Sequence, residues 1–393
     1  MKFHYARPNL TEADVAEVIS ALGQQFLSQG PIVGHLENKL QTLFSVKNAV
    51  VCNSGTAALH MAYDGIGLRP GAGLITSSVT FLATANAARF CDAPVGFADV
   101  DPLTGNVTVD TLKAAVNAAK FDVKAIAVVH LGGRPCDIIG IKEYADSIGA
   151  CLIEDACHAP MAEYKDNSGE QFSVGSCAHS HAATLSLHAI KHMTTGEGGV
   201  LLTNDDELAE RARLFRSHGI TRDVSEMVNS KDAGSPWYYE MQQLGHNYRL
   251  SEINCALCLN QVERLSANID RRQEIAKLYH SFLADLDALH LPEIASSVGT
   301  THAWHLFAPA FDFDHIGKSR KQIMVELAGK GIGTQVHYIP LYRQPYYRED
   351  YSTDVFDGAE TYYKKTLSIP MYYGLSDEDV ETISAGVRSV IDS

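Results

Sequence analysis

Short apolar runs alternate with segments of helical periodicity from about residue 45 onward. The first run, at 48–53, is rich in β-branched residues, and apolar residues recur at helical spacing in the segment 56–66 that follows it. Further strands are predicted by the apolar runs at 73–78, 93–100, 124–131, 150–156 and 183–188. The segment 196–205 predicts a turn that leads into a strand, and the segment 205–218 predicts a helix. This alternation is typical of an α/β fold whose largely parallel sheet is covered by helices on both faces.

The pattern changes near residue 250, where a long amphipathic stretch spans 249–283 and predicts a helix. We therefore divide the chain into a large α/β domain, 1–245, and a smaller α+β domain, 246–393, which begins with this bridging helix. Within the smaller domain the sequence predicts a strand at 302–312, a helix at 319–331, an aromatic loop at 337–352 and a final helix from about Ser376.

Composition and charge narrow the possible partners. The chain has 393 residues, of which 46% are hydrophobic and 20% charged, as in a globular protein with a substantial core. The 32 Lys and Arg residues against 47 Asp and Glu residues give a net charge of −15, which argues against binding to nucleic acid or to an anionic membrane. The sequence shows no apolar stretch of about 18 residues and no secretory signal, so we expect a cytoplasmic protein.

The cysteines and histidines do not form a recognisable metal motif. The eight cysteines are scattered and are expected to be reduced thiols. Cys255 and Cys258 have CxxC spacing, but they lie in the predicted bridging helix, where we expect them to pack in the core. Four histidines lie close in sequence without a carboxylate or cysteine at zinc-site spacing: His179, His181, His188 and His192. No metal site is predicted.

Lys191 is the first candidate for chemistry. It lies in the segment 186–199, where a predicted strand runs into a loop of small, hydroxylated and glycine residues. A lysine without acidic neighbours at such a position can be desolvated, which lowers the pKa of its ammonium group and makes the neutral amine nucleophilic. Schiff-base chemistry requires such an amine. The alternative is an ordinary surface lysine.

Two further segments follow predicted strands. Ser54, Gly55 and Thr56 stand between a strand and a helix, where the first N–H groups of the helix can bind a phosphate. A simple helix cap is the alternative for these residues. Asp155 closes the apolar run 150–156, at the end of a strand where open α/β sheets place their ligands. A buried aspartate there needs a partner, such as the protonated nitrogen of a pyridine ring.

A phosphate cup, a carboxylate and a lysine are together the parts needed to hold pyridoxal phosphate (PLP). With these motifs the sequence resembles the DegT-type sugar-nucleotide aminotransferases, which belong to the fold-type I PLP enzymes. The resemblance covers nearly the whole chain and rests on ordered motifs that include GPIVGHLENKL, CNSGTAALHMA, EDACHA, SLHAIKHMTTGEGGVLLTND, GHNYRLSEINCAL and GTQVHYIPLY. It implies a mostly parallel seven-stranded sheet and a homodimer with shared active sites.

The resemblance also implies roles for individual residues. Lys191 would form the Schiff base with PLP and move the proton during transfer, and Asp155 would pair with the pyridine nitrogen. Other cofactor contacts would come from the Gly55 and Thr56 amides and the Ser186 hydroxyl at the phosphate, from His158 and Phe81 at the ring, and from Asn247 at the phosphate in the neighbouring subunit. Leu187 and Cys157 depart from the residues common in the family.

Within the family, the finer resemblance is to members that act in pseudaminic acid biosynthesis. It implies L-glutamate as amino donor and UDP-2-acetamido-2,6-dideoxy-β-L-arabino-hex-4-ulose as acceptor. The residues that would contact the sugar nucleotide are Tyr5, Gln25, Phe26, Leu27, Ser28, Gly55, Ser186, Arg249, Gln335, Val336, His337, Tyr338 and Tyr342.

Two alternatives stay open. The acceptor can instead be UDP-4-keto-6-deoxy-D-GlcNAc or a dTDP-linked keto sugar, because the choice depends on pocket shape. The alternative from another class of protein is a regulator that binds PLP but catalyses no reaction. A purely structural sugar-binding role would not need Lys191, so the substitution Lys191→Ala would leave it intact.

Overall fold

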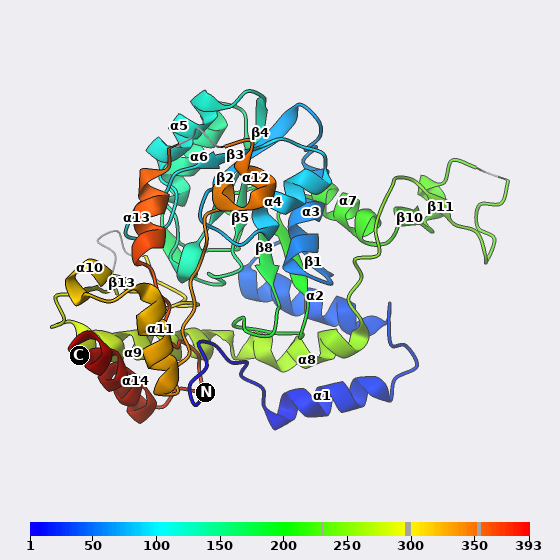
Figure 1. Cartoon of the computed structure of the whole chain (residues 1–393). Helices are drawn as coiled ribbons and strands as arrows, with labels where there is room; N and C mark the ends of the chain where they lie inside the picture. The colour runs from blue at the N-terminus through cyan, green and yellow to red at the C-terminus, as the bar shows by residue number, and fades with distance from the viewer. Residues whose placement is uncertain (230, 295–299, 352–354) are drawn as a thin grey trace.

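The computed structural model describes residues 1–229, 231–294, 300–351 and 355–393. A seven-stranded sheet forms its centre, with strand order β1 (Asn48–Cys52), β9 (Gly199–Thr203), β8 (Ala182–Ser186), β5 (Cys151–Asp155), β4 (Asp122–Val129), β2 (Ala72–Ser77) and β3 (Val95–Ala98). Only β9 among these strands runs antiparallel to its neighbours. The predicted α/β fold with a mostly parallel seven-stranded sheet is confirmed (Figure 1).

The apolar runs form strands because the sheet is covered on both faces. All residues of β1, β2 and β9 are buried, as continuous apolar runs require. Helix α3 packs against β1, β8 and β9, and α5 packs against β2 and β3. The helices of this part are α1 (Glu12–Leu22), α2 (Pro31–Phe44), α3 (Gly55–Gly65), α4 (Ala83–Phe90), α5 (Val109–Ala118), α6 (Ile138–Ser147) and α7 (Asp206–Arg216), with the 3₁₀ turn η1 (Leu131–Gly133).

The predicted bridging helix is present as two helices, α8 (Glu252–Glu263) and α9 (Leu265–Leu283), because the chain leaves helical geometry at Arg264 (φ −98°, ψ 3°). Helices α1 and α2 pack on α8, and α14 packs on α9. The remaining helices of the C-terminal part are α10 (Phe313–Ile316), α11 (Arg320–Gly329), η3 (Leu341–Arg343), α12 (Pro345–Arg348), α13 (Asp357–Lys365) and α14 (Asp377–Ile391).

Buried apolar residues form two clusters. One surrounds the seven-stranded sheet, and the other joins Phe3 to residues of α9, α11 and α14. The division of the chain into domains at 245 and 246 stays a prediction.

The predicted strand 302–312 is wrong for most of its length. Only Ala310–Phe311 is a strand, β13, which pairs with β12 (Leu289–His290). The preceding residues instead bond to the turn η1, where Ala303 N–H donates to the Gly133 carbonyl and Leu306 N–H to the Gly132 carbonyl. Tertiary contacts with this turn therefore replace the strand pairing that the apolar pattern suggested.

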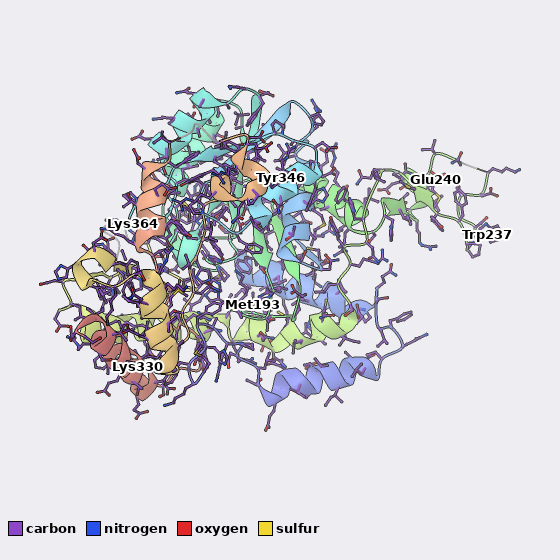
Figure 2. The ribbon with its side chains drawn as sticks, in the orientation of Figure 1. Met193, Trp237, Glu240, Lys330, Tyr346 and Lys364 are labelled. Atoms are coloured by element: carbon purple, nitrogen blue, oxygen red, sulfur yellow. The ribbon has the colours of Figure 1, made fainter. Side chains whose placement is uncertain are left out.

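Two small hairpins complete the structure, β6 (Glu163–Lys165) with β7 (Gln171–Ser173), and β10 (Ile220–Thr221) with β11 (Glu240–Met241). The second is the base of an arm that includes the turn η2 (Val224–Glu226) and projects away from the rest of the chain (Figure 1). Trp237 and Glu240 lie on this arm, well apart from Met193 beside the sheet (Figure 2). In the described parts of the chain, no helix has the length and apolar character needed to cross a membrane.

Candidate active site

The candidate residues meet at one edge of the sheet. Strands β1, β5 and β8 run parallel, so their carboxyl ends lie together at this edge. The ends are followed by the turn 53–56, by Asp155 to His158 and by the loop that carries Lys191. Ligands of open α/β sheets bind at such an edge.

The turn after β1 forms a cup at the start of α3. Ser54 caps the helix, and its hydroxyl accepts a hydrogen bond from the Ala57 N–H at 3.1 Å. The first N–H groups of a helix have no partner within it, so those of Gly55 and Thr56 point out of its end. A Cβ added to Gly55 would lie 3.1 Å from the Ser186 Cβ, so glycine lets the cup approach the end of β8. The cup can accept a phosphate.

Asp155 is buried at the end of β5 with hydrogen-bonding capacity to spare. Its Oδ2 accepts the Thr84 hydroxyl at 2.7 Å, and its Oδ1 accepts the Cys157 N–H at 3.2 Å. Two carboxylate oxygens offer about four acceptor positions, so a further N–H donor can bind. A ring nitrogen that carries a proton is such a donor.

Lys191 lies in the loop between β8 and β9, where its surroundings favour the neutral amine. Burial lowers the pKa of the Lys191 ammonium group, although nearby Cys157 and Asp155 oppose the shift. A small cavity is lined by residues of this loop and of the segment after β5, among them Met193, which is labelled in Figure 2. The amine therefore has the character that a nucleophilic lysine needs.

His158 joins the site to the C-terminal part of the chain. Its Nδ1 accepts the Gly132 N–H at 3.3 Å, and its Nε2 lies 3.2 Å from the Tyr338 hydroxyl. Burial and the charge of Lys191 hold the pKa of His158 well below its usual value, so the ring is neutral. With Nδ1 as acceptor, the proton must be on Nε2, which donates to the Tyr338 oxygen. The Tyr338 hydroxyl is then free to donate to a ligand.

Aromatic residues from distant parts of the sequence extend the site. The ring centroids of Phe81 and Tyr338 are 6.0 Å apart, those of Tyr338 and His337 4.9 Å, and those of His337 and Tyr5 5.5 Å. The Phe81 ring is 56% exposed, which leaves its face open to a flat ligand. Such rings suit the stacking of a cofactor or base.

Five other predicted site residues are exposed. The residues from Gln25 to Ser28 run beside the start of α8, where Leu27 accepts a hydrogen bond from the Glu252 N–H. Asn247 is exposed, and its carbonyl accepts the Asn53 side-chain amide at 3.2 Å.

Four more residues were predicted to bind the sugar nucleotide, and they differ in their contacts and exposure. The Tyr342 ring stacks on Phe356 at a centroid distance of 4.4 Å, and its hydroxyl donates a hydrogen bond to Glu360 at 2.7 Å. Arg249 and Val336 are half-buried, and Gln335 is exposed.

Two residues at the site were not found by sequence reasoning. Thr84 lies in the first turn of α4, and His305 lies in the segment 302–312, for which the sequence predicts a strand. His305 Nε2 is 3.4 Å from Lys191 Nζ. The only available signal was the repeated histidine in HAWHLF, which periodicity alone assigns to a strand face.

The residues fit pyridoxal phosphate. Gly55 and Thr56 amides offer donors to a phosphate, Asp155 offers a free acceptor position to a pyridine N–H, and Lys191 offers an amine of lowered pKa. The described residues hold no group of three or more His, Cys, Asp or Glu that could bind a metal ion.

Comparisons with known proteins agree with this chemistry. The DegT/DnrJ/EryC1/StrS aminotransferase family matches residues 8–388. The spore coat polysaccharide biosynthesis protein SpsC of Bacillus subtilis is 35% identical over 390 residues, which are 98% of this chain and 96% of that protein.

Solved structures are similar over the full length. Helicobacter pylori PseC, an aminotransferase of pseudaminic acid biosynthesis, has a TM-score of 0.90 and 28% identity over 100% of both chains. A putative sugar aminotransferase of Streptococcus pneumoniae, Spr1654, solved in its PLP form, has a TM-score of 0.86 and 23% identity over 100% of this chain and 99% of that one. The chain belongs to the DegT/DnrJ/EryC1/StrS aminotransferase family and is a sugar aminotransferase that uses PLP.

Proposed function

We propose that the enzyme transfers the amino group of L-glutamate to C-4 of UDP-2-acetamido-2,6-dideoxy-β-L-arabino-hex-4-ulose, a UDP-linked 4-keto-6-deoxy-N-acetylhexosamine. The full-length similarity to PseC, with a TM-score of 0.90, is the observation that supports this substrate. The ketone oxygen is replaced by an amino group and a hydrogen, and glutamate leaves as 2-oxoglutarate. The product is UDP-4-amino-4,6-dideoxy-N-acetyl-β-L-altrosamine, a precursor of pseudaminic acid.

The roles that we propose for the cofactor residues follow from their positions. When bound, PLP supplies an electron sink for the carbon that gains or loses the proton. Lys191 would hold the cofactor covalently before the substrate binds, and its neutral amine, once released, would move that proton. Asp155 accepts the ring N–H and keeps the ring nitrogen protonated. Gly55, Thr56 and Ser186 bind the phosphate, while His158 and Phe81 lie along the ring.

The sugar nucleotide is proposed to bind on the aromatic side of the site. Tyr338 donates the hydrogen of its hydroxyl to the substrate, because the Tyr338 oxygen already accepts a hydrogen bond from His158 Nε2–H. Tyr5 and His337 lie beside it, and Gln335 and Val336 precede it in the chain. Tyr342 is bonded to Glu360 here, so it contributes only if that contact opens.

We propose a homodimer in which each subunit completes the site of the other. Asn247 reaches the phosphate and Arg249 the substrate in the neighbouring subunit. The residues from Gln25 to Ser28 also contact the sugar nucleotide. Support comes from the exposure of Asn247 and of the 25–28 segment, which leaves them open to a second copy.

We also propose a cytoplasmic location. All eight cysteines are free thiols, and five of them are fully or nearly buried. Unpaired thiols in this number are typical of a reducing compartment.

The 35% identity to SpsC favours a second candidate acceptor. SpsC acts in the biosynthesis of a spore coat polysaccharide, so a different keto sugar nucleotide is the competing substrate. UDP-4-keto-6-deoxy-D-GlcNAc and a dTDP-linked keto sugar represent this class.

A single-turnover assay distinguishes the candidates. The protein, loaded with pyridoxamine phosphate, is mixed with each ketone, and the return of the PLP absorbance is followed. Rapid return with the L-arabino ketone alone is the expected result. Return with the D-configured or dTDP-linked ketone alone would contradict the proposed substrate while retaining the aminotransferase. The Lys191→Ala variant should be inactive with all of them.

A further inference from the structure

His305 is held against the amine of Lys191. Its Nε2 lies 3.4 Å from Lys191 Nζ, and the side chain is only 3% exposed. The other ring nitrogen, Nδ1, is buried and has no hydrogen-bond partner in the described part of the chain. One side of the imidazole is therefore directed at the lysine, and the other makes no competing contact.

The backbone on both sides of His305 is fixed. Ala303 and Leu306 donate to the carbonyls of Gly133 and Gly132 in the turn η1. The Trp304 carbonyl accepts a hydrogen bond from the Arg272 guanidinium at 2.9 Å. Three hydrogen bonds over four residues thus hold the ring in place, although the segment has no regular secondary structure.

The groups that face His305 keep its ring neutral. His158 lies with its ring centroid 4.3 Å away, His192 with its centroid 5.5 Å away, and Lys191 and Arg272 supply positive charge. Burial is the largest cause of the lowered pKa of His305, and each of these neighbours lowers that pKa further. Asp155 and Cys157 act on Lys191 and favour its charged form. The imidazole therefore keeps a lone pair for a donor.

The tautomer of His305 follows from its partner. A neutral imidazole has one N–H and one lone pair. A lysine side chain can donate to a lone pair whether it is an amine or an ammonium ion, but only the amine can accept. A lone pair on Nε2 therefore satisfies Lys191 in both protonation states, and the proton of the ring belongs on the unpartnered Nδ1.

We propose that His305 is a positioning residue that accepts a hydrogen bond from the free Lys191 amine and holds it in place whenever the lysine is not joined to the cofactor. The inference rests on the role proposed above for Lys191. The amine must be released and must return in each catalytic cycle, and a fixed acceptor keeps it within reach. The imidazole stays neutral throughout, so no proton is gained or lost by His305.

The test measures the rate at which the cofactor-free protein captures PLP. Stopped-flow absorbance follows the appearance of the visible absorption band of protein-bound PLP. The variant His305→Phe keeps a ring but removes the acceptor, and its capture rate should fall about tenfold, as for one lost hydrogen bond. His305→Gln places an amide oxygen near the position of Nε2 and should restore the rate to within about threefold of the native value. His305→Asn reaches only the position of Nδ1, so it is a second variant without the contact should phenylalanine disturb folding.

His302→Asn is the matched control. His302 lies in the same segment, stacked on Trp304 at 3.8 Å, and its Nδ1 accepts the Trp304 N–H at 2.9 Å, a hydrogen bond that the asparagine oxygen can also accept. No contact joins the described ring of His302 to Lys191. Its capture rate should equal that of the native protein. If His305→Phe captured PLP at the native rate, or if His305→Gln captured it as slowly as His305→Phe, the positioning role of His305 would be wrong. The role of Lys191 would then still stand. If the native protein formed no visible band with PLP, the proposed role of Lys191 would fail together with this inference.

Discussion

Asp155 shows how one residue at a strand end can control the electronic state of a ring. The Thr84 hydroxyl and the Cys157 N–H orient the carboxylate from two sides, and neither neutralises its charge. Buried negative charge needs a positive partner or strong donors, and the proposed pyridinium N–H provides both. In the proposed site, this carboxylate would therefore both bind the cofactor and act on its chemistry.

The variant Asp155→Asn separates these two functions. The amide is nearly the same size as the carboxylate, so PLP should still bind, but the ring nitrogen loses the charge that keeps its proton. We expect the single-turnover rate with L-glutamate to fall by at least about tenfold, which corresponds to about 1.4 kcal/mol in the barrier. A rate within twofold of the native one would show that the carboxylate has no electronic role. Asp166→Asn, at an exposed hairpin turn, is the matched control.

At the scale of elements, the cofactor cup depends on the strand beside it. Gly199 begins β9 opposite Cys52, the last residue of β1. A Cβ at Gly199 would overlap the Ser54 carbonyl oxygen and would lie 2.6 Å from the Gly55 nitrogen. The cup keeps its position only because this residue has no side chain.

Gly199→Ala should therefore weaken cofactor binding. The added methyl group must displace the turn 54–55 and its N–H groups, so we expect the dissociation constant for PLP to rise by about tenfold or more, in line with overpacking costs of about 1–3 kcal/mol. Equilibrium titration of the visible band measures it. Gly34→Ala in α2, where an added Cβ meets nothing within 4 Å, should leave the constant unchanged. Equal constants for both variants would contradict the account of the cup.

The secondary-structure elements also differ in how well the sequence predicts them. The predicted ends of five strands differ from the observed ends by two residues or fewer: β1, β2, β4, β5 and β8. The prediction succeeds there because continuous apolar runs are typical of strands buried on both faces. The predicted strand at 302–312 was wrong because its residues bond to the turn η1, which is distant in sequence. Lys191 and Asp155 could be predicted because each lies at or just after the end of an apolar run, and Ser186 could be predicted from the family resemblance. Thr84 and His305 could not, since a helix and an irregular segment bring them there.

At the scale of the whole molecule, buried neutral histidines link stability to pH. Burial lowers the pKa of His60 to about 4, and those of His302 and His337 to about 3. The unfolded chain binds protons at these residues below about pH 6.5, while the folded chain does not until the pH falls to these lower values. The stability that they contribute is therefore present above pH 6.5 and is lost as the pH falls below it.

The expected loss is at most about 1.4 kcal/mol per pH unit for each buried histidine. Thermal unfolding at pH 7.5, 6.5, 5.5 and 4.5 measures it, and the melting temperature should be level down to pH 6.5 and then fall. His302→Phe should make the fall shallower, and the substitution of exposed His315 by Phe should not. A melting temperature that is constant from pH 6.5 to 4.5 would contradict the neutral state of these histidines.

The central claim is that Lys191 is the lysine that holds PLP at the end of β8. Borohydride reduction of the PLP-loaded protein fixes the cofactor on whichever lysine carries it, and peptide mass mapping identifies that lysine. We predict the label on the peptide that contains Lys191, and its loss together with the visible band in Lys191→Ala. A label on another lysine, or a stable visible band in Lys191→Ala, would contradict the account of the site.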